Sequence, residues 1–467
     1  RLIIDEEMSN VQIQTITLHT ITLIENAILN MGNKRLFNTF NNFITQVKKE
    51  FIKPYNIKRN IAEFVYFDIE IPKELDKEIF NQKDKAVQEA YLALIDLIRH
   101  GGYVQYSNDI NKKCITTYSH ININNPSFYT VQLDATAKIN CLYDINDNYV
   151  LVDLPDFKTY QNTYIHIFDK ITGSRSTIEK GLNEGLLESC IKDIKSKAQK
   201  GDKILIILNN KKYIDLFKEK FYEDSIIVEN SKLISADTSQ QYKIDFTYYG
   251  AFTGKNDWAT YNKLFLIGIP IYGETAYPIL YNVNSDVENF LKLDTTLIPM
   301  NGARRYLQKE FEDVRVSIIA KELIQGINRI RCRMFEDGDT PEAHVYMINK
   351  DKEVDELIRR AMPGVNILYD WDLNYEHEYN NKEKALTKEE ILINEIIKIQ
   401  DNPVYRELLV TKGILTNKGI KKSALRELCG FQARNTLSNA IKSPIFQQFC
   451  SDRNIDISNT KAHYIKI

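Results

Sequence analysis

The sequence predicts an α/β protein in which mostly parallel strands alternate with helices that cover both faces of a sheet. Continuously apolar runs at Lys203–Leu208 and Leu264–Ile269 are typical of central strands that are buried on both faces. An amphipathic helical stretch, Lys211–Phe221, follows the first of these strands. Strands that alternate with helices favour a parallel sheet. A polar stretch without periodicity, residues 374–386, is interpreted as a linker to a small helical region.

The bulk composition is that of a globular protein with no overall nucleic-acid signature. The chain has 467 residues, which favours about three domains. Its formal net charge is -2, so any nucleic-acid binding must use local basic patches. The six cysteines are scattered without a Cys-x-x-Cys pair, which indicates neither a zinc site nor a disulfide framework. No run of about 18 apolar residues occurs. These features predict a reducing, cytoplasmic location.

The N-terminal part begins with a short apolar strand that runs into acidic residues. Leu2–Ile4 is expected to be a central strand, and Asp5 and Glu6 then lie at its carboxyl end, where open α/β sheets bind ligands. Because the chain starts inside an expected core strand, we expect the protein to extend further upstream. Residues 11–100 are predicted to be mostly helical, with amphipathic stretches at Ile21–Ile28, Lys34–Phe51 and Lys83–Arg99.

The strands are expected to resume after Gly101-Gly102, which stops the third helix. One predicted strand ends at Leu133, and Asp134-Ala135-Thr136 turns off its tip. Short polar side chains at a strand tip can bridge a nucleotide site to a neighbouring domain, or they can simply cap the next helix. The remaining predicted elements are strands at 103–106, 114–118, 128–133, 149–152, 164–168, 246–249 and 343–348, loops at 170–177 and 250–258, and helices at 182–197 and 303–328.

Three arginines at alternate positions end the helix predicted over 303–328. Arg329, Arg331 and Arg333 close the segment Glu322–Arg333. Alternate residues fan around a helix or continue along an extended exit from it. Clustered guanidinium groups suit a phosphate, because the planar fork is permanently charged and binds oxyanions through two bonds. The alternative is a basic helix end that complements the helix dipole.

The C-terminal region is predicted to be helical with helix-turn-helix spacing. Helices are expected at Lys421–Leu428, Arg434–Lys442 and Ile445–Phe449, with a turn around Gly430-Phe431. Lys421 and Arg434 contribute to a local positive charge that could contact DNA. The alternative is a small helical domain with no such contact.

Together these signals resemble superfamily 2 helicases and translocases of the DEAD/DEAH-like type. The acidic pair after a strand, the Asp-Ala-Thr tip and the Gln325-x-x-x-Arg329-x-Arg331 helix end follow in the order of that family's motifs. The loop with Gly250, Gly254, Asn256 and Trp258 resembles one in helicase-like proteins of phages and mobile elements. The resemblance implies two RecA-like lobes, the first one incomplete, and a small all-α domain. The implied ranges are 1–140 for the first lobe with a helical insertion at about 9–102, 141–373 for the second lobe, 374–386 for the linker and 387–467 for the helical domain.

The resemblance also implies roles for single residues, with ATP and Mg²⁺ as cofactors. Asp5 would hold Mg²⁺, and Glu6 would orient the attacking water. Gln325 would face the nucleotide, and Arg329 would be an arginine finger with Arg331 as its partner. The remaining implied roles are coupling of hydrolysis to the neighbouring domain by Asp134 and Thr136, and nucleic-acid contact by Arg175, Lys255, Asn256, Trp258, Lys421 and Arg434. For Trp258, core packing is the alternative.

Several departures from the family pattern keep a second function open. No Gly-x-x-x-x-Gly-Lys-Ser/Thr phosphate loop occurs, Asn328 replaces a glycine, and Cys332 stands where a second arginine is expected. We therefore expect ATP hydrolysis only from a longer protein, in phage or mobile-element DNA replication or recombination in a bacterial host. The partner would be DNA, with RNA also possible. The alternative is a non-catalytic module that binds nucleic acid or a replication protein. A metal-dependent nuclease built on Asp5, Glu6 and Glu7 is disfavoured, because no further carboxylate cluster is apparent.

Overall fold

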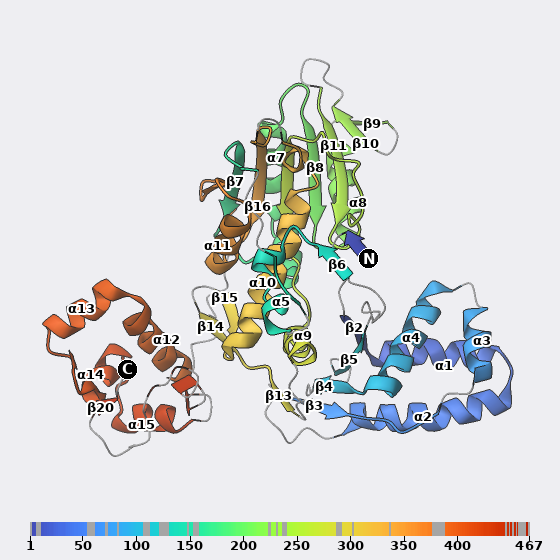
Figure 1. The fold of residues 1–467 in the computed structure, drawn as a ribbon, viewed down its shortest axis with the longest axis horizontal. Coiled ribbons are helices and arrows are strands. Elements are labelled where there is room, and N and C mark those ends of the chain that lie inside the picture. The colour runs from blue at the N-terminus through green and yellow to red at the C-terminus, as the bar shows by residue number, and fades with distance from the viewer. Residues whose placement is uncertain are drawn as a thin grey trace. The chain divides into compact units, whose positions relative to one another are not determined.

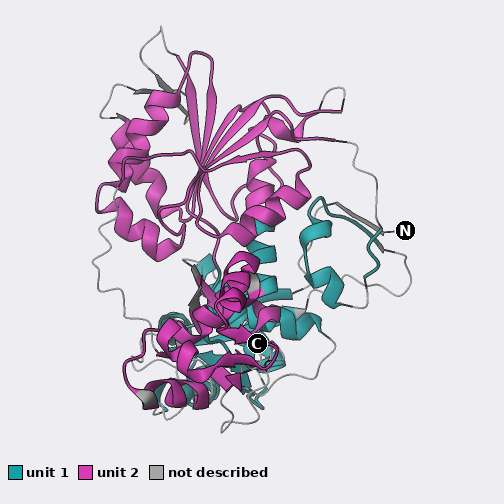
Figure 2. Cartoon of the chain, turned by 90° about the vertical axis from the view of Figure 1, so that its left-hand side faces the viewer, with its two compact units in different colours: residues 1–154, 272–296, 313–321 teal, residues 155–271, 297–312, 322–467 magenta. Residues whose placement is uncertain are grey.

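The computed structural model groups the chain into two compact units (Figure 2). Unit 1 comprises residues 1–154, 272–296 and 313–321, and unit 2 comprises residues 155–271, 297–312 and 322–467. The residues that the structure describes are 2–5, 11–53, 61–70, 73–81, 84–105, 113–120, 130–146, 149–152, 158–222, 226–229, 232–235, 241–285, 292–300, 303–335, 338–375, 388–443, 446–447, 449–450, 453, 455 and 464–465.

Unit 1 contains one parallel strand pair and one antiparallel sheet. Strand β1 (Leu2–Asp5) pairs in parallel with β6 (Thr130–Leu133). In the described residues, the antiparallel sheet has the order β13-β3-β4-β5-β2. Its strands are β2 (Val11–Ile16), β3 (Ile61–Val65), β4 (Gly102–Gln105), β5 (Cys114–His120) and β13 (Lys292–Asp294). The helices and short turns of unit 1 are α1 (Leu18–Asn30), α2 (Lys34–Ile52), α3 (Lys73–Phe80), α4 (Lys85–His100), η2 (Ala137–Ile139), α5 (Leu142–Ile145) and α9 (Ala276–Asn284).

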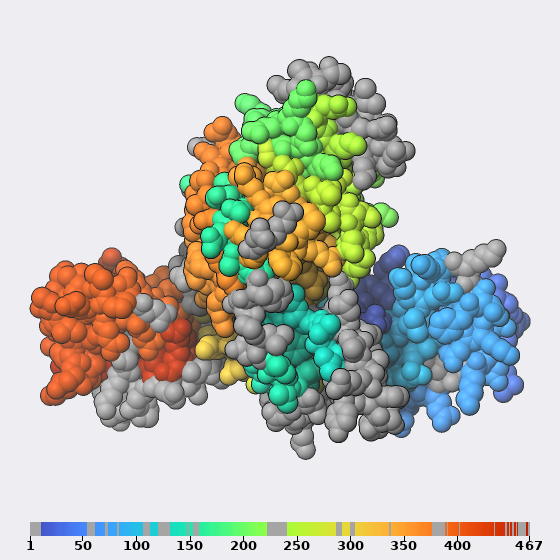
Figure 3. All heavy atoms as spheres, turned by 45° about the horizontal axis from the view of Figure 1, so that its top comes forward, coloured from blue at the N-terminus to red at the C-terminus, as the bar shows by residue number. Residues whose placement is uncertain are grey.

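The insertion predicted as helical over residues 9–102 therefore contains strands as well. The helical faces are as predicted, since Ile21, Ile24 and Ile28 are buried and Gly101 ends α4 with a φ of 72°. The residues Val11–Ile16 alternate in polarity, however, and pair with β5 along their whole length. Figure 3 shows the side chains of this region, in blue, gathered into one body. Their core joins the helices to the antiparallel sheet, with Leu94, Val104 and Ile115 among its members.

Unit 2 is organised around a mostly parallel sheet (Figure 1). Across the described strands, its order is β17-β7-β16-β12-β8-β11-β10-β9. All neighbours from β17 to β11 are parallel, and β10 and β9 add antiparallel pairs at one edge. The strands are β7 (Thr163–Phe168), β8 (Lys203–Leu208), β9 (Ile226–Glu229), β10 (Lys232–Ser235), β11 (Lys243–Tyr248), β12 (Lys263–Ile267), β16 (Ala343–Ile348) and β17 (Asn366–Leu368).

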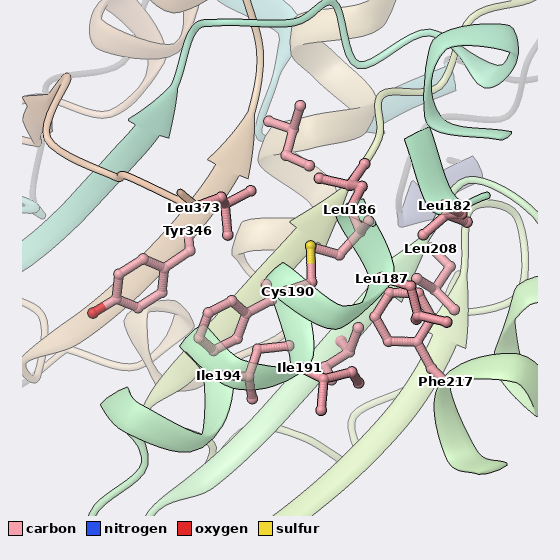
Figure 4. Packing of buried hydrophobic residues seen from close by; sticks show 14 of the residues in the cluster. Leu182, Leu186, Leu187, Cys190, Ile191, Ile194, Leu208, Phe217, Tyr346 and Leu373 are labelled. Carbon is pink, nitrogen blue, oxygen red and sulfur yellow. The ribbon is translucent and has the colours of Figure 1, made fainter. Parts of the chain in front are cut away.

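Helices cover both faces of this sheet, as the sequence predicts. On one face, α6 (Arg175–Leu182), α7 (Leu186–Lys197) and α8 (Lys212–Tyr222) pack on alternate strand residues, and Figure 4 shows Cys190 and Phe217 in this core. On the other face, Gly326 of α10 (Lys309–Ile327) approaches Ile207 and Leu266. Helix α11 (Lys352–Ala361) follows β16. Because both faces are covered, β8 and β12 are apolar after their first lysine.

Three sequence predictions in unit 2 and its flanks are wrong in detail. Residues 149–152 form no strand, and Val150 is 88% exposed, because none of the described strands pairs with this apolar run. The helix predicted over 182–197 is broken at Gly185, whose φ of 99° is left-handed. The helix predicted over 303–328 begins only at Lys309, because β15 (Ala303–Tyr306) forms a hairpin with β14 (Leu297–Met300).

The C-terminal part of unit 2 is helical with a small sheet added. Helices α14 and α15 have the bounds expected for the helix-turn-helix pair within one residue. A three-stranded antiparallel sheet in the described residues supplements the predicted helices. The predicted linker 374–386 lies outside the described residues apart from Asn374 and Tyr375. The elements are α12 (Lys388–Asp401), α13 (Pro403–Thr411), β18 (Leu415–Thr416), β19 (Gly419–Lys421), α14 (Lys422–Leu428), α15 (Arg434–Lys442) and β20 (Tyr464–Ile465).

Candidate functional site

The parallel pair in unit 1 brings together two acidic segments that are far apart in the sequence. Asp5 is the last residue of β1 and lies opposite Leu133, the last residue of β6. Asp134 therefore follows directly at the same edge, where carboxyl ends of parallel strands place ligands. The side chain of Asp5 and all of Glu6 lie outside the described residues. Their roles toward Mg²⁺ and water stay predictions.

Asp134 caps the turn that follows its strand. Its Oδ1 accepts hydrogen bonds from the backbone N and the Oγ1 of Thr136, at 2.8 and 2.6 Å. Its Oδ2 accepts a bond of 2.8 Å from the hydroxyl of Tyr143. Thr136 is buried. This geometry is the capping alternative raised from the sequence, and coupling by Asp134 and Thr136 stays a prediction.

The arginine segment of unit 2 begins where α10 ends. Arg329 is only 6% exposed, although it follows the helix immediately. Its Nη1 donates a hydrogen bond of 3.1 Å to the carbonyl oxygen of Lys255, and its guanidinium lies 5.7 Å from the ring centroid of Phe252. A backbone carbonyl and an aromatic face are both favourable partners for a cation. The segment 325–331 and the loop 250–258, which the sequence singled out separately, are thus in direct contact.

The other two arginines take separate partners. The backbone N of Arg331 donates to the carbonyl of Tyr261 at 2.9 Å, and its Nε donates to the carbonyl of Glu342. The guanidinium of the exposed Arg333 donates to Oδ1 of Asn256. The three arginines therefore diverge to separate partners, as alternate positions at a helix exit do. The partnership of Arg331 with Arg329 at one phosphate stays a prediction.

Cys332 is buried beside the arginines, among the half-buried residues Lys158, Tyr160 and Asn328. Its Sγ donates to the carbonyl oxygen of Ile327 at 3.0 Å, and burial raises its pKa to about 12. The hydroxyl of Tyr160 donates to Oδ1 of Asn328 at 3.2 Å, and burial raises the pKa of Tyr160 to about 12. Burial also lowers the pKa of Lys158, whose Nζ lies 3.1 Å from the carbonyl oxygen of Arg333. The neutral thiol of Cys332 is no nucleophile. The hydrogen bonds of Tyr160 and Lys158 to Asn328 and Arg333 support the arginine segment.

Gln325 lies in the last turns of α10 and is half-buried. The neighbouring Gly326 has its Cα close to the sheet, since an added Cβ would lie 3.3 Å from Ile207 and 3.8 Å from Phe252. This close approach fixes the height of the helix end above the sheet. A contact between Gln325 and a nucleotide stays a prediction.

The predicted nucleic-acid contacts differ in their exposure. Arg175 is exposed at the first position of α6, which Ser174 caps by accepting from the backbone N of Thr177. Lys255 and Asn256 are exposed in their loop. Trp258 is only 4% exposed, and its Nε1 donates to Oδ2 of Asp245 at 2.7 Å. The packing alternative therefore describes Trp258, because a buried ring offers no face to a base.

The two predicted contacts in the C-terminal part lie at helix starts. Lys421 is exposed and precedes α14. Arg434 is the first residue of α15, and its side chain lies outside the described residues. DNA contact by either residue stays a prediction.

Comparisons with known proteins find matches among solved structures. No family model and no curated protein matches the chain. A solved structure described as that of S. tokodaii Xpd4 is 11% identical, with a TM-score of 0.37 over 76% of this chain and 72% of that chain. A likeness of this size carries no argument about activity.

Clustered metal ligands and long apolar helices are both absent from the described part of the chain. Among the described side chains, no group of three or more His, Cys, Asp or Glu residues could hold a metal ion. None of the described helices combines the length and apolar character that a membrane crossing requires.

Sequence reasoning missed the residues that support the arginine segment. Asp245 lies inside the strand Lys243–Tyr248, and a carboxylate in such a strand is a signal that could have been noticed. Lys158 and Tyr160 precede β7 in a segment with no motif, so nothing in their spacing links them to Arg333 or Asn328.

Proposed function

We propose that this chain belongs to an ATP-dependent helicase or translocase that acts on DNA. One observation carries the proposal: the Arg329 guanidinium donates to the carbonyl of Lys255, which joins two segments that the sequence selected independently. Both segments border the covered parallel sheet of unit 2. In such a site, catalysis depends on positioning and on charge stabilisation.

In this proposal each candidate residue has one task. Asp5 binds Mg²⁺ through its carboxylate, the ligand type that this hard cation prefers. Its position beside Asp134 at one sheet edge fits that task. Glu6 orients the attacking water, Gln325 faces the nucleotide, and Arg329 stabilises charge on the transferred phosphoryl group. ATP supplies that group, and Mg²⁺ neutralises part of its charge.

Nucleic-acid binding would use basic and polar residues of unit 2. Arg175 sits at a helix N-terminus, where backbone N–H groups also favour an anion. Lys255 and Asn256 offer a second contact, and Lys421 and Arg434 a third near the C-terminus. Such contacts bind the phosphate backbone without reading sequence. DNA is the proposed strand, and RNA competition tests that choice. The proposed setting is replication or recombination of a phage or mobile element, in the cytoplasm of a bacterial host.

Nucleic-acid-stimulated ATP hydrolysis by the full-length protein tests the proposal. Glu6→Gln and Arg329→Ala should each lower turnover by about 10³-fold or more. Arg359→Ala is the matched control, because Arg359 is an exposed arginine that pairs with Glu356 on α11. Wild-type turnover in both test variants would refute these assignments.

A non-catalytic binding module is the second candidate, and one observation favours it. Arg329 already contacts the Lys255 carbonyl and the Phe252 ring, and the expected second arginine is replaced by the buried Cys332. In this case the full-length protein would bind single-stranded DNA without ATP turnover. Arg329→Ala would then leave DNA affinity unchanged while Arg175→Ala lowered it.

A further inference from the structure

The loop between β11 and β12 holds the arginine segment through its backbone. We refer to residues 249–261 as the arginine-holding loop. The carbonyl of Lys255 accepts from Arg329 Nη1 at 3.1 Å, and the carbonyl of Tyr261 accepts from the backbone N of Arg331 at 2.9 Å. Backbone carbonyls cannot be repositioned by a rotamer change, so the path of this loop decides where the Arg329 guanidinium points.

One carboxylate ties this loop to the sheet. Oδ2 of Asp245, in β11, accepts the indole Nε1 of Trp258 at 2.7 Å and lies 3.5 Å from the hydroxyl of Tyr261. Strand β11 pairs with β8 over six residues, so Asp245 is fixed in a central position. Hydrogen bonds to an ionised acceptor are roughly twice as strong as neutral ones. Trp258 follows Lys255 by three residues, and the carbonyl of Tyr261 itself accepts from the backbone N of Arg331.

We propose that Asp245 and Trp258 are positioning residues that hold the Arg329 guanidinium in its working orientation. The contact runs from Asp245 to Trp258, then along the backbone to Lys255 and on to Arg329. This inference rests on the proposed function, because it assigns the orientation of that site's arginine. A charged donor gives catalytic benefit only where it is pre-organised, and a displacement of about 1 Å can cost about 10²-fold in rate.

The same unit contains a matched control for the indole–carboxylate bond. Nε1 of Trp371 donates to Oδ2 of Asp193, in α7, at 2.8 Å. Trp371 is as buried as Trp258, at 4% exposure each. The two tryptophans are the only ones in the chain. Each bond joins a buried indole to a carboxylate, but only the Trp258 bond belongs to the arginine-holding loop.

Tryptophan fluorescence tests the link between Asp245, Trp258 and Arg329 without a measurement of enzymatic activity. In the Trp371→Phe protein, Trp258 is the only tryptophan, and acrylamide quenching reports its exposure. Asp245→Asn and Arg329→Ala should each raise the quenching constant, by about twofold or more for a ring that is almost fully buried in the wild type. In the Trp258→Phe protein, the same two substitutions should leave quenching of Trp371 unchanged. Unchanged quenching of Trp258 in Arg329→Ala would overturn the inference.

Steady-state ATP hydrolysis by the full-length protein tests the catalytic consequence. Trp258→Phe should lower kcat by about tenfold or more and leave the KM for ATP within about twofold, because the misplaced arginine acts in the transition state. Trp371→Phe should leave kcat unchanged. In an Arg329→Ala background, Trp258→Phe should have no further effect. Equal losses in Trp258→Phe and Trp371→Phe would show a purely structural role and overturn the inference.

The two experiments distinguish a failure of the proposed function from a failure of the positioning inference. If the wild-type protein shows no nucleic-acid-stimulated hydrolysis, the proposed function fails, and the quenching result still decides whether Asp245 and Trp258 position Arg329. If hydrolysis is present but insensitive to Trp258→Phe, the proposed function stands and the positioning inference is overturned.

Discussion

Arg305 donates from Nη2 to Oδ1 of Asp351 at 2.6 Å, with both side chains almost completely buried. The same guanidinium contacts Glu312 at 3.4 Å and Glu353 at 2.5 Å. It therefore links β15, the first turns of α10 and the start of α11. Two of the three carboxylates, those of Glu312 and Asp351, are buried with it. The cluster fixes the helix that ends at the arginine segment.

Removing this guanidinium should strongly destabilise unit 2. Arg305→Met leaves buried carboxylates without their counter-charge, which costs about 3–5 kcal/mol. Urea unfolding followed by circular dichroism measures the decrease. Arg359→Met breaks an exposed pair with Glu356 and should cost less than about 1 kcal/mol. Similar decreases in both variants would contradict the role given to the buried cluster.

Stability should fall as pH rises through the titration of Asp355. Burial raises the pKa of this carboxyl from 3.8 to about 6, against hydrogen bonds from Tyr369 and Asn349 that favour ionisation. The folded chain therefore keeps the proton that the unfolded chain has already released. This carboxyl alone should lower the free energy of unfolding by about 2 kcal/mol between pH 4 and pH 6, out of about 3 kcal/mol over its whole titration.

Urea midpoints at pH 4.5 and pH 7.5 isolate this contribution. Asp355→Asn should reduce the difference between the two midpoints by the contribution of the Asp355 carboxyl. Asp372→Asn, at an exposed position, should retain the wild-type difference. An unaltered pH dependence in Asp355→Asn would show that another group is responsible.

Gly268 should tolerate no side chain, because it combines two constraints. Its φ is 100°, and an added Cβ would lie 2.6 Å from Nδ2 of Asn209. Gly250→Ala is the control, since Gly250 has a φ of 86° but open space around it. The control should lose about 1–2 kcal/mol from the backbone conformation alone. Gly268→Ala should lose about 1–3 kcal/mol more from the clash, as measured by urea unfolding. Adding Asn209→Ala should recover part of that excess; no recovery would exclude the clash as its cause.

The salt dependence of single-stranded DNA binding should identify the residues that bind phosphate. The slope of log affinity against log salt becomes shallower by about 0.7 for each phosphate that the protein no longer neutralises. Arg175→Ala and Lys255→Ala should each reduce the slope by about this amount in fluorescence anisotropy titrations. Arg359→Ala should not change it. A slope equal to that of the wild type in Arg175→Ala would mean that Arg175 binds no phosphate.

Sequence patterns predicted strands β8 and β16 of unit 2 well, because burial on both faces favours a mostly apolar run. Strand β16 has the predicted bounds Ala343–Ile348, and β8 those of Lys203–Leu208. An apolar run alone does not predict a strand correctly where pairing with another strand decides the conformation. Residues 149–152 are as apolar as a strand but pair with none of the described strands, whereas Ala303–Tyr306 is predicted as helix and instead pairs with Leu297–Met300.

The candidate site was predictable only where a motif marks it. The arginine segment and the loop with Lys255 stand out by composition, and the structure joins them. Asp245 could not be linked to Trp258 from the sequence, because their contact depends on how the loop returns to its own strand. The capping geometry of Asp134 depends equally on the turn that follows it.

The order of strands in unit 2 has a consequence for synthesis on the ribosome. Strand β7 lies between β16 and β17, and both of its partners are encoded nearly 200 residues later. At a synthesis rate of about 5–20 residues per second, β7 waits on the order of 10 to 40 s for its first neighbour. During that time Ile165 and Ile167 lack the two strands that pair with β7 in the folded protein. We expect a chaperone that binds emerging chains to bind this apolar segment.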